Sequence, residues 1–154
     1  MSAYTIKLAY DEIDNVRQLF REYTDFLGVD LGFQHYDEEI HALPGKYALP
    51  DGRLLVVYYE DQLAGCVAMR KIDEKSCEFK RLFVRSEYRG KLLGRMLMEK
   101  VIEDAKRAGY ETGYLDTLST LKSAVAIYKR LGFEEIPAYY DNPLKNVEYY
   151  KIDL

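Results

Sequence analysis

The chain has 154 residues, of which 48% are hydrophobic and 31% are charged, and its net charge is −4. This size and composition are those of a globular protein, and we expect residues 1–154 to form a single domain. The acidic balance argues against nucleic-acid binding, which needs a basic surface. No apolar run is long enough to span a membrane, and the first residues do not resemble a secretion signal, so we expect a cytoplasmic protein.

The first fifty residues predict one strand followed by two helices. Tyr4–Leu8 alternates as a strand does, whereas the apolar residues of Asp11–Leu27 follow the spacing of a helix. Asp11 is the expected N-cap of this helix, and Gly28 marks its end. A second, shorter helix is expected over Tyr36–Leu43, just before a Pro-Gly pair.

The middle of the chain predicts an antiparallel meander of three strands. These strands are expected over Leu54–Tyr59, Leu63–Ile72 and Ser76–Val84, with short polar turns between them. Gly65, inside the second strand, indicates a bulge or a close approach of another backbone.

The two cysteines, Cys66 and Cys77, lie in apolar strand-like runs. Their spacing matches no metal motif, so we expect buried free thiols and no metal. A turn over Asp73–Lys75 would pair Cys77 with a residue near Lys71. The two sulfurs would then lie too far apart to form a disulfide.

The rest of the chain predicts alternating helices and strands, and Gly132 is a typical residue to follow a helix end. The expected fold class is α/β, with a mixed central sheet of about six to seven strands flanked by about four helices. The remaining elements are a helix over Leu92–Ala108, a strand over Glu111–Thr117, a helix over Leu121–Leu131, and strands over Phe133–Ile136 and Val147–Ile152 joined by the loop Pro137–Asn146.

The stretch Arg89–Arg95 reads Arg-Gly-Lys-Leu-Leu-Gly-Arg and lies between an expected strand and an expected helix. The first backbone N–H groups of a helix have no intrahelical partners, and with the helix dipole they favour an anion. Arg89, Lys91 and Arg95 add positive charge. This pattern indicates a phosphate or pyrophosphate cradle, although an ordinary strand-to-helix turn with a solvated basic face would carry the same residues.

Residues Cys77–Phe133 resemble the GNAT superfamily of acyl-CoA-dependent N-acetyltransferases. The resemblance is carried by the strand Cys77–Val84, by Arg85–Arg95 and by Ala124–Phe133. The pyrophosphate loop of the family is written Arg/Gln-x-x-Gly-x-Gly/Ala. Arg89 and Gly94 match it, but Leu92 stands where the middle glycine is usual, so Leu92 must adopt a backbone conformation that can still present its amide.

The order of the expected elements is also that of the family. Two segments, Leu43–Tyr47 and Tyr139–Pro143, resemble an uncharacterised bacterial branch of it. The resemblance implies acetyl-CoA as cosubstrate, without a metal. It implies backbone contacts to the pantetheine arm from the end of one strand and contacts to the pyrophosphate from the turn that follows. The cofactor-binding residues expected on this basis are Leu82, Phe83, Val84, Arg89, Gly90, Lys91, Leu92, Leu93, Gly94 and Arg95.

The resemblance also implies two catalytic residues. Tyr128 lies where the family has its general-acid tyrosine, and a tyrosine hydroxyl is protonated at neutral pH. Glu78, six residues before Val84, has the spacing of the base glutamate in members that acetylate lysine, and it would act through a water molecule. The alternatives are that Tyr128 only packs in the core, and that Glu78 forms an ion pair with Lys80, Arg81 or Arg70.

In the family the acceptor pocket is formed by the first two helices and the loop between the last strands, here Phe26–Tyr47 and Pro137–Asn146. The expected function is therefore acetyl transfer to a primary amine of a small molecule or peptide, with no nucleic-acid or membrane partner. A homodimer is one expected assembly. Two alternatives stay open, namely a non-catalytic acetyl-CoA sensor or interaction module, and a different nucleotide-binding α/β protein.

Overall fold

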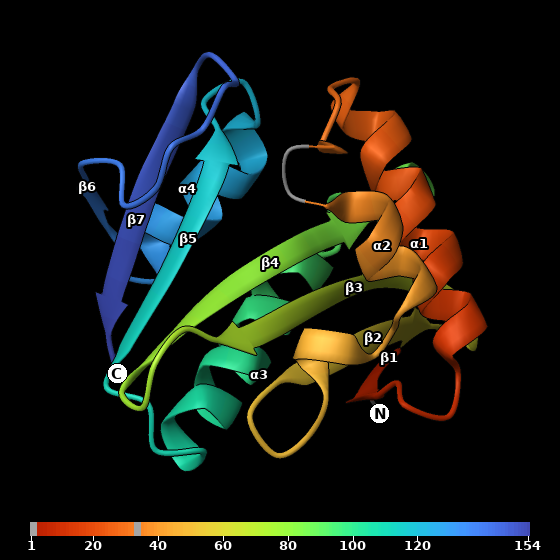
Figure 1. Ribbon diagram of the computed structural model, residues 1–154. Helices are drawn as coiled ribbons and strands as arrows, with labels where there is room; N and C mark the ends of the chain where they lie inside the picture. Colours follow the sequence, from red (N-terminus) through yellow and green to blue (C-terminus); the bar gives the residue numbers. More distant parts are fainter. Residues whose placement is uncertain (1–2, 33–34) are drawn as a thin grey trace.

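The computed structural model describes residues 3–32 and 35–154. Within them, one mixed sheet has seven strands in the order β1-β2-β3-β4-β5-β7-β6 (Figure 1). This confirms the expected α/β class. The elements are β1 (Tyr4–Leu8), α1 (Ile13–Leu27), α2 (Tyr36–His41), η2 (Gly45–Tyr47), β2 (Arg53–Tyr59), β3 (Gln62–Lys71), β4 (Ser76–Val84), η3 (Ser86–Tyr88), α3 (Leu93–Arg107), β5 (Thr112–Leu118), α4 (Lys122–Arg130), β6 (Glu134–Ile136) and β7 (Val147–Asp153).

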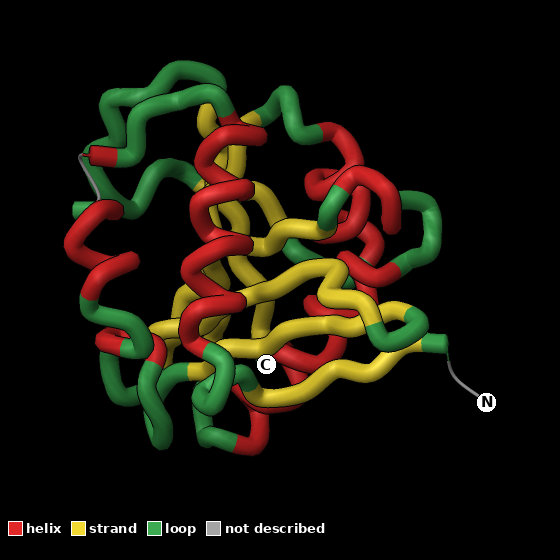
Figure 2. Tube along the Cα trace, turned by 90° about the vertical axis from the view of Figure 1, so that its right-hand side faces the viewer, coloured by secondary structure: helices red, strands yellow, loops and turns green. Residues whose placement is uncertain are grey.

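Two hydrophobic cores cover the two faces of the sheet. One core packs α1 and α2 against β2 and β3 through residues such as Leu19, Phe20 and Ile40. The other packs α3 and α4 against the opposite face through Leu97, Met98 and Tyr128, among others. Figures 1 and 2 show α1 and α2 together on one side of β1–β4. This layering leaves the edges of β4 and β5 between the two groups of helices.

The strands β4 and β5 form the parallel pair of the sheet, and they separate after a short contact. Their pairing runs only from Ser76↔Thr112 to Glu78↔Tyr114. Beyond it β4 leans toward β3, while β5 pairs with β7 along its whole length (Figure 1). The two halves of the sheet therefore diverge after Glu78. Among the described residues, the backbone of β4 beyond Glu78 has no strand partner on its β5 side.

The expected helix ends are partly confirmed. Gly28 ends α1 in the left-handed conformation with φ 66°, as the sequence indicates. The expected N-cap at Asp11 is wrong, because the cap position is Glu12, which makes no side-chain capping bond. Glu12 instead binds Lys7 at 2.6 Å and accepts a hydrogen bond from Tyr58. Its carboxylate therefore joins α1 to the sheet rather than capping the helix.

The predictions for the meander are confirmed. Lys71 pairs with Cys77, and both cysteines are buried free thiols. A Cβ added to Gly65 would lie 2.4 Å from the carbonyl oxygen of Phe83, so this glycine does permit a close backbone approach. Within the described residues, no group of three or more potential ligands is arranged to hold a metal ion. No helix in those same ranges is long and apolar enough to cross a bilayer.

Candidate active site

The turn before α3 has the geometry of an anion site. Gly90 and Leu92 both have left-handed backbones, with φ of 83° and 63°. Leu92 is the N-cap residue of α3, and no side chain caps this end. The side chain of Leu92 is 64% exposed, so the residue that replaces the usual glycine is accommodated by pointing outward. The first amides of α3 thus stay available to a ligand.

A groove of about 690 Å³ starts at this turn and runs along the end of β4 toward α4. Nine of the ten residues expected to bind the cofactor line it, namely Leu82, Phe83, Val84, Arg89, Gly90, Leu92, Leu93, Gly94 and Arg95. Lys91 does not line it, because its ammonium lies 4.8 Å from the ring centre of Tyr59. The groove also has a wall that the sequence did not indicate as a whole. It is formed by the two residues before α4 and by one side of that helix, namely Thr120, Leu121, Lys122, Ser123, Ala124, Ala126, Ile127 and Arg130.

A bulge in β4 forms the inner end of the groove. Arg81 has a φ of 64°, and the register between β3 and β4 shifts between Cys66 and Ala68. The Cys66 thiol donates to the carbonyl oxygen of Arg81 at 3.4 Å. This contact holds the bulge from the β3 side, so the backbone after Arg81 faces the gap toward β5.

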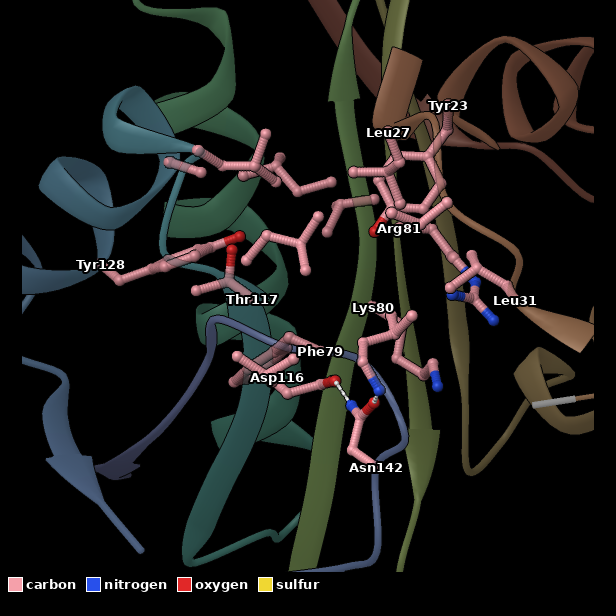
Figure 3. Close-up of a pocket in the computed structure, with 18 of the residues that line it drawn as sticks. Tyr23, Leu27, Leu31, Phe79, Lys80, Arg81, Asp116, Thr117, Tyr128 and Asn142 are labelled. Atoms are coloured by element: carbon pink, nitrogen blue, oxygen red, sulfur yellow. Dashed lines mark hydrogen bonds between the residues drawn. The ribbon is translucent and has the colours of Figure 1, made fainter. Parts of the chain in front are cut away.

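Tyr128 reaches the gap from the opposite side. Its ring is 7% exposed and packs edge-on against Phe133 at 5.7 Å. Figure 3 shows its hydroxyl pointing into the space between β4 and β5, beside Thr117. Burial raises the pKa of Tyr128 above its ordinary value. The hydroxyl makes no hydrogen bond with any residue that the structure describes, so it is both protonated and available to a ligand.

Glu78 lies in the sheet beneath this gap and is 2% exposed. One carboxylate oxygen accepts from Arg70 Nε at 2.8 Å and lies 3.6 Å from Lys80 Nζ. The other accepts from the Tyr139 hydroxyl at 2.7 Å. Burial disfavours the charged form, but Lys80, Arg70 and Tyr139 outweigh it and lower the pKa of Glu78. The ion pair considered from the sequence is therefore present, but its members are Arg70 and Lys80 and not Arg81.

Arg81 instead binds a residue of α2. Its guanidinium donates to the two oxygens of Glu39 at 2.9 and 3.0 Å and stacks over the ring of Tyr36 at 4.7 Å. Lys46 lies 3.0 Å from Glu39 as well. Burial opposes the charge of Glu39, but Arg81 and Lys46 outweigh it and lower its pKa to about 2. This buried cluster fixes α2 against β4.

A second, narrower pocket of about 60 Å³ adjoins the groove and shares Tyr23, Leu82, Leu121 and Ala124 with it. It lies between α1, β4, β5 and the loop before β7 (Figure 3). Its other walls include both apolar and polar side chains. They are Leu27, Val29, Leu31, Leu144 and Val147 on the apolar side, and Lys80, Arg81, Asp116, Thr117, Tyr128 and Asn142 on the polar side.

Asp116 is the carboxylate that lines this pocket, and sequence reasoning missed it. It accepts from the Tyr140 hydroxyl at 2.5 Å and from the Asn142 amide at 3.4 Å (Figure 3). Burial raises the pKa of Asp116 in spite of these contacts. Alternation along β5 could have indicated which face of the sheet carries Asp116, because Asp116 follows Tyr114 by two residues and lies on the same face. No neighbouring residue in the sequence, however, distinguishes Asp116 from an acid exposed to solvent.

A groove that begins at the uncapped start of α3 therefore adjoins a narrower pocket lined by a buried, protonated tyrosine. Residues 13–133 match the model of the Acetyltransferase (GNAT) family. The chain belongs to this family, and it is an acyl-CoA-dependent N-acetyltransferase by class.

Two curated relatives match over nearly their whole lengths. An uncharacterised N-acetyltransferase of Schizosaccharomyces pombe is 40% identical, covering 100% of this chain and 95% of that protein. Another, from Dictyostelium discoideum, is 36% identical, with coverages of 95% and 96%. Both organisms are eukaryotes, so the expected bacterial branch is not confirmed.

Two solved structures share the fold. An acetyltransferase from Streptococcus agalactiae has a TM-score of 0.81 and 21% identity, and the alignment covers 100% of both chains. A putative acetyltransferase from Salmonella typhimurium, solved with its cofactor acetyl-CoA, has a TM-score of 0.71 and 19% identity, with coverages of 99% and 94%. At these identities the likeness concerns the fold alone.

Proposed function

We propose that the protein transfers the acetyl group of acetyl-CoA to a primary amine of a small molecule or peptide. The observation that carries this proposal is the junction of the two cavities. The groove and the acceptor pocket share Leu82 of β4, and Tyr128 lines the acceptor pocket beside it. A thioester lying along β4 would therefore face both an amine and a protonated hydroxyl.

The proposed cofactor position follows from the groove. The pyrophosphate lies on the amides at the start of α3, with Arg89 and Arg95 beside it. The pantetheine arm runs along the unpaired edge of β4 after Arg81, where a backbone N–H can polarise the thioester carbonyl. A protein of the same fold from Salmonella typhimurium was solved with acetyl-CoA, which supports acetyl-CoA as the cosubstrate.

The proposed acid is Tyr128. The amine nitrogen attacks the thioester carbon, the carbon–sulfur bond breaks, and the departing thiolate takes the phenolic proton of Tyr128. The attacking nitrogen loses two protons in all. The base takes one before the attack, and the other, lost as the tetrahedral intermediate collapses, restores the phenol of Tyr128. The products are then the N-acetylated amine and the thiol of CoA.

The proposed base is a carboxylate beneath the gap. Glu78, expected from the sequence, would act through water, but both of its oxygens are occupied and its pKa is lowered. Asp116 lines the acceptor pocket and its pKa is raised, which suits a base better. The geometry therefore favours Asp116 as the group that takes the first proton, with Glu78 as the competing assignment.

A thiol-release screen with acetyl-CoA over amino acids, amines, polyamines and aminoglycosides tests the function. We expect release that depends on at least one amine and that is lost in the Tyr128→Phe variant. Tight binding of acetyl-CoA by calorimetry, without release for any acceptor, would favour the non-catalytic sensor instead. The expected cytoplasmic location and homodimer stay predictions.

A further inference from the structure

The acceptor pocket extends through the gap between β4 and β5, so it has walls on both faces of the sheet. On the face covered by α3 and α4 its lining includes Val67, Phe79 and Met98, which belong to the hydrophobic core on that side. These three residues are at most 3% exposed, and we call them the apolar end of the pocket. The acetyl transfer proposed above assigns no role to any of them.

The charged residues that line the pocket lie on the opposite face of the sheet. Arg81 binds a carboxylate of α2 on that face. Because side chains alternate along a strand, Lys80 lies on the face opposite Phe79. Asp116 likewise lies opposite Leu115, which belongs to the core beneath α3. An amine that approaches the proposed base Asp116 therefore does not enter the apolar end.

The acyl group has to lie where the groove and the pocket meet, because the amine must reach the thioester carbon. Leu82 and Ala124 line both cavities at this junction, and both pack against the core on the side of α3 and α4. In the proposed arrangement the thioester sulfur leads back into the groove and the oxygen faces the β4 backbone. The alkyl group is the remaining substituent of the thioester carbon, and it points from the junction toward the apolar end.

The size of the pocket allows an acyl chain longer than acetyl. A cavity needs about 10–15 Å³ to hold one water-sized group, so the 60 Å³ of this pocket accommodate about four to six such groups. The methyl of an acetyl group and the nitrogen of the amine account for two of them. By this measure about two further methylene groups can follow the acetyl methyl.

Met98 is the residue of the apolar end that can adapt to such a chain. Phe79 is fixed, because its ring packs edge-on against Phe133 at 6.0 Å and a Cβ on Gly113 would lie only 2.4 Å from it. Val67 is branched at Cβ, which restricts its rotamers. The side chain of Met98 is unbranched, with three rotatable bonds, and can move to fit a neighbouring group.

We propose that the protein also transfers propionyl and butyryl groups from their CoA esters, with the chain beyond the acetyl methyl lying in the apolar end. This inference rests on the proposed function and keeps its chemistry. The carbon–sulfur bond breaks, the carbon–nitrogen bond forms, and the thiolate takes the proton of Tyr128. Each methylene buried among apolar side chains strengthens binding by about fourfold, so the longer esters should bind at least as tightly as acetyl-CoA.

Isothermal titration calorimetry with acetyl-CoA and butyryl-CoA tests the inference without an acceptor. In the unmodified protein butyryl-CoA should bind up to about sixteenfold more tightly than acetyl-CoA. Met98→Ala should increase this ratio of affinities, because the longer chain fills the space left by the thioether. Met98→Phe should decrease it, because the ring fills the apolar end. Met96→Phe is the matched control on the same helix; Met96 is not among the residues that line either cavity, so the ratio should not change.

The readout is the ratio between the two esters within each protein, and titration with CoA verifies that each variant is folded. Weaker binding of butyryl-CoA than of acetyl-CoA by the unmodified protein would overturn the inference. A ratio that is the same in Met98→Ala and Met98→Phe would overturn it as well.

Thiol release with an amine found in the acceptor screen tests the transfer step. We expect a kcat/KM for butyryl-CoA within about tenfold of that for acetyl-CoA. Consumption of acetyl-CoA but not of butyryl-CoA would overturn the inference and leave the proposed function intact. If neither ester were consumed with any amine, the proposed function would fail, whereas the affinity ratios would still report whether the apolar end binds the chain.

Discussion

At the scale of single residues, the site depends on two kinds of buried group. Tyr128 is neutral and its hydroxyl has no hydrogen-bond partner that the structure describes, whereas Glu78 is charged and both of its oxygens accept hydrogen bonds. A neutral hydroxyl next to a thioester can donate a proton, but a carboxylate that already accepts hydrogen bonds from Arg70 and Tyr139 is a weaker base. These environments therefore favour Tyr128 as the proposed acid and a structural ion pair as the role of Glu78.

Tyr128→Phe tests the acid. The ring and its contact with Phe133 are kept, so affinity for acetyl-CoA should be nearly unchanged. The turnover number should fall by about 10²–10⁴-fold, the contribution of a positioned acid. Such a fall with an unchanged Michaelis constant marks an interaction made only in the transition state. Steady-state kinetics measure it, and a fall of less than about tenfold would contradict the role, because a thiolate is a fair leaving group unaided.

The pH dependence of kcat distinguishes the two candidate bases. A base must be deprotonated, so kcat should rise with pH through the pKa of that base. If Asp116 is the base, this rise occurs above the usual pKa of an aspartate, because burial raises the pKa. If Glu78 is the base, it occurs below the usual pKa of a glutamate, because Lys80 and Arg70 outweigh burial.

We expect Asp116→Asn to lower kcat by about 10²–10⁴-fold and to abolish the rise of kcat with pH on the acidic side of the profile, here called the acidic limb. Glu78→Gln, the matched isosteric control, should leave the limb in place even if it lowers stability. The opposite pattern would assign the base to Glu78. Both profiles should be measured with the same saturating acceptor, so that the limb reports the bound complex.

At the scale of elements, the turn between η3 and α3 is where we propose that the pyrophosphate of acetyl-CoA binds. Gly94 lies in the first turn of α3, and a Cβ added there would lie 3.2 Å from Cδ1 of Ile127 and 3.8 Å from Cγ2 of Val84. A small side chain can therefore be accommodated by a slight shift of a flexible methyl group. The position also lines the groove where the phosphates are proposed to lie.

Gly94→Glu should abolish binding of acetyl-CoA, because it adds bulk and a negative charge beside the phosphates. Gly94→Ala is the matched control and should retain affinity to within about tenfold. Isothermal titration calorimetry measures both. If a folded Gly94→Glu protein bound with unchanged affinity, the phosphates would have to lie elsewhere.

At the scale of the whole molecule, the cluster of Arg81, Glu39 and Lys46 connects the helical layer to the sheet. The folded state lowers the pKa of Glu39 to about 2, against its ordinary value of 4.5. A depressed pKa contributes stability that is present above the ordinary value. That contribution is lost as pH falls toward the folded-state value. The free energy of unfolding should therefore fall between about pH 4.5 and pH 2.

Glu39→Gln leaves the guanidinium of Arg81 buried without its counter-ion, so we expect a loss of about 3–5 kcal/mol in the free energy of unfolding. Replacing both partners, as in Glu39→Leu with Arg81→Leu, should cost less than the single change. Urea unfolding at neutral pH measures the three proteins. A single variant as stable as the parent protein would contradict the buried ion pair.

The elements of the fold could be predicted from the sequence because their causes are local. The alternation of β1, the helical spacing of α1 and the glycine after it are properties of consecutive residues. The same holds for the turn before α3, whose glycines and basic residues lie within Arg89–Arg95. Nearly all the residues expected at the groove do line it for this reason.

Only the tertiary structure decided which carboxylates lie at the narrow pocket between β4 and β5 and which are neutralised. Glu78 and Asp116 are 38 positions apart in the printed sequence, and the parallel pairing of β4 with β5 brings them to one face of the sheet. Glu39 is separated from both by whole elements, and the packing of α2 places it on Arg81. Sequence patterns report the neighbours of a residue along the chain. The burial of a side chain and the charges around it depend instead on contacts between distant segments. Those contacts determine the pKa values of the carboxylates and of Tyr128.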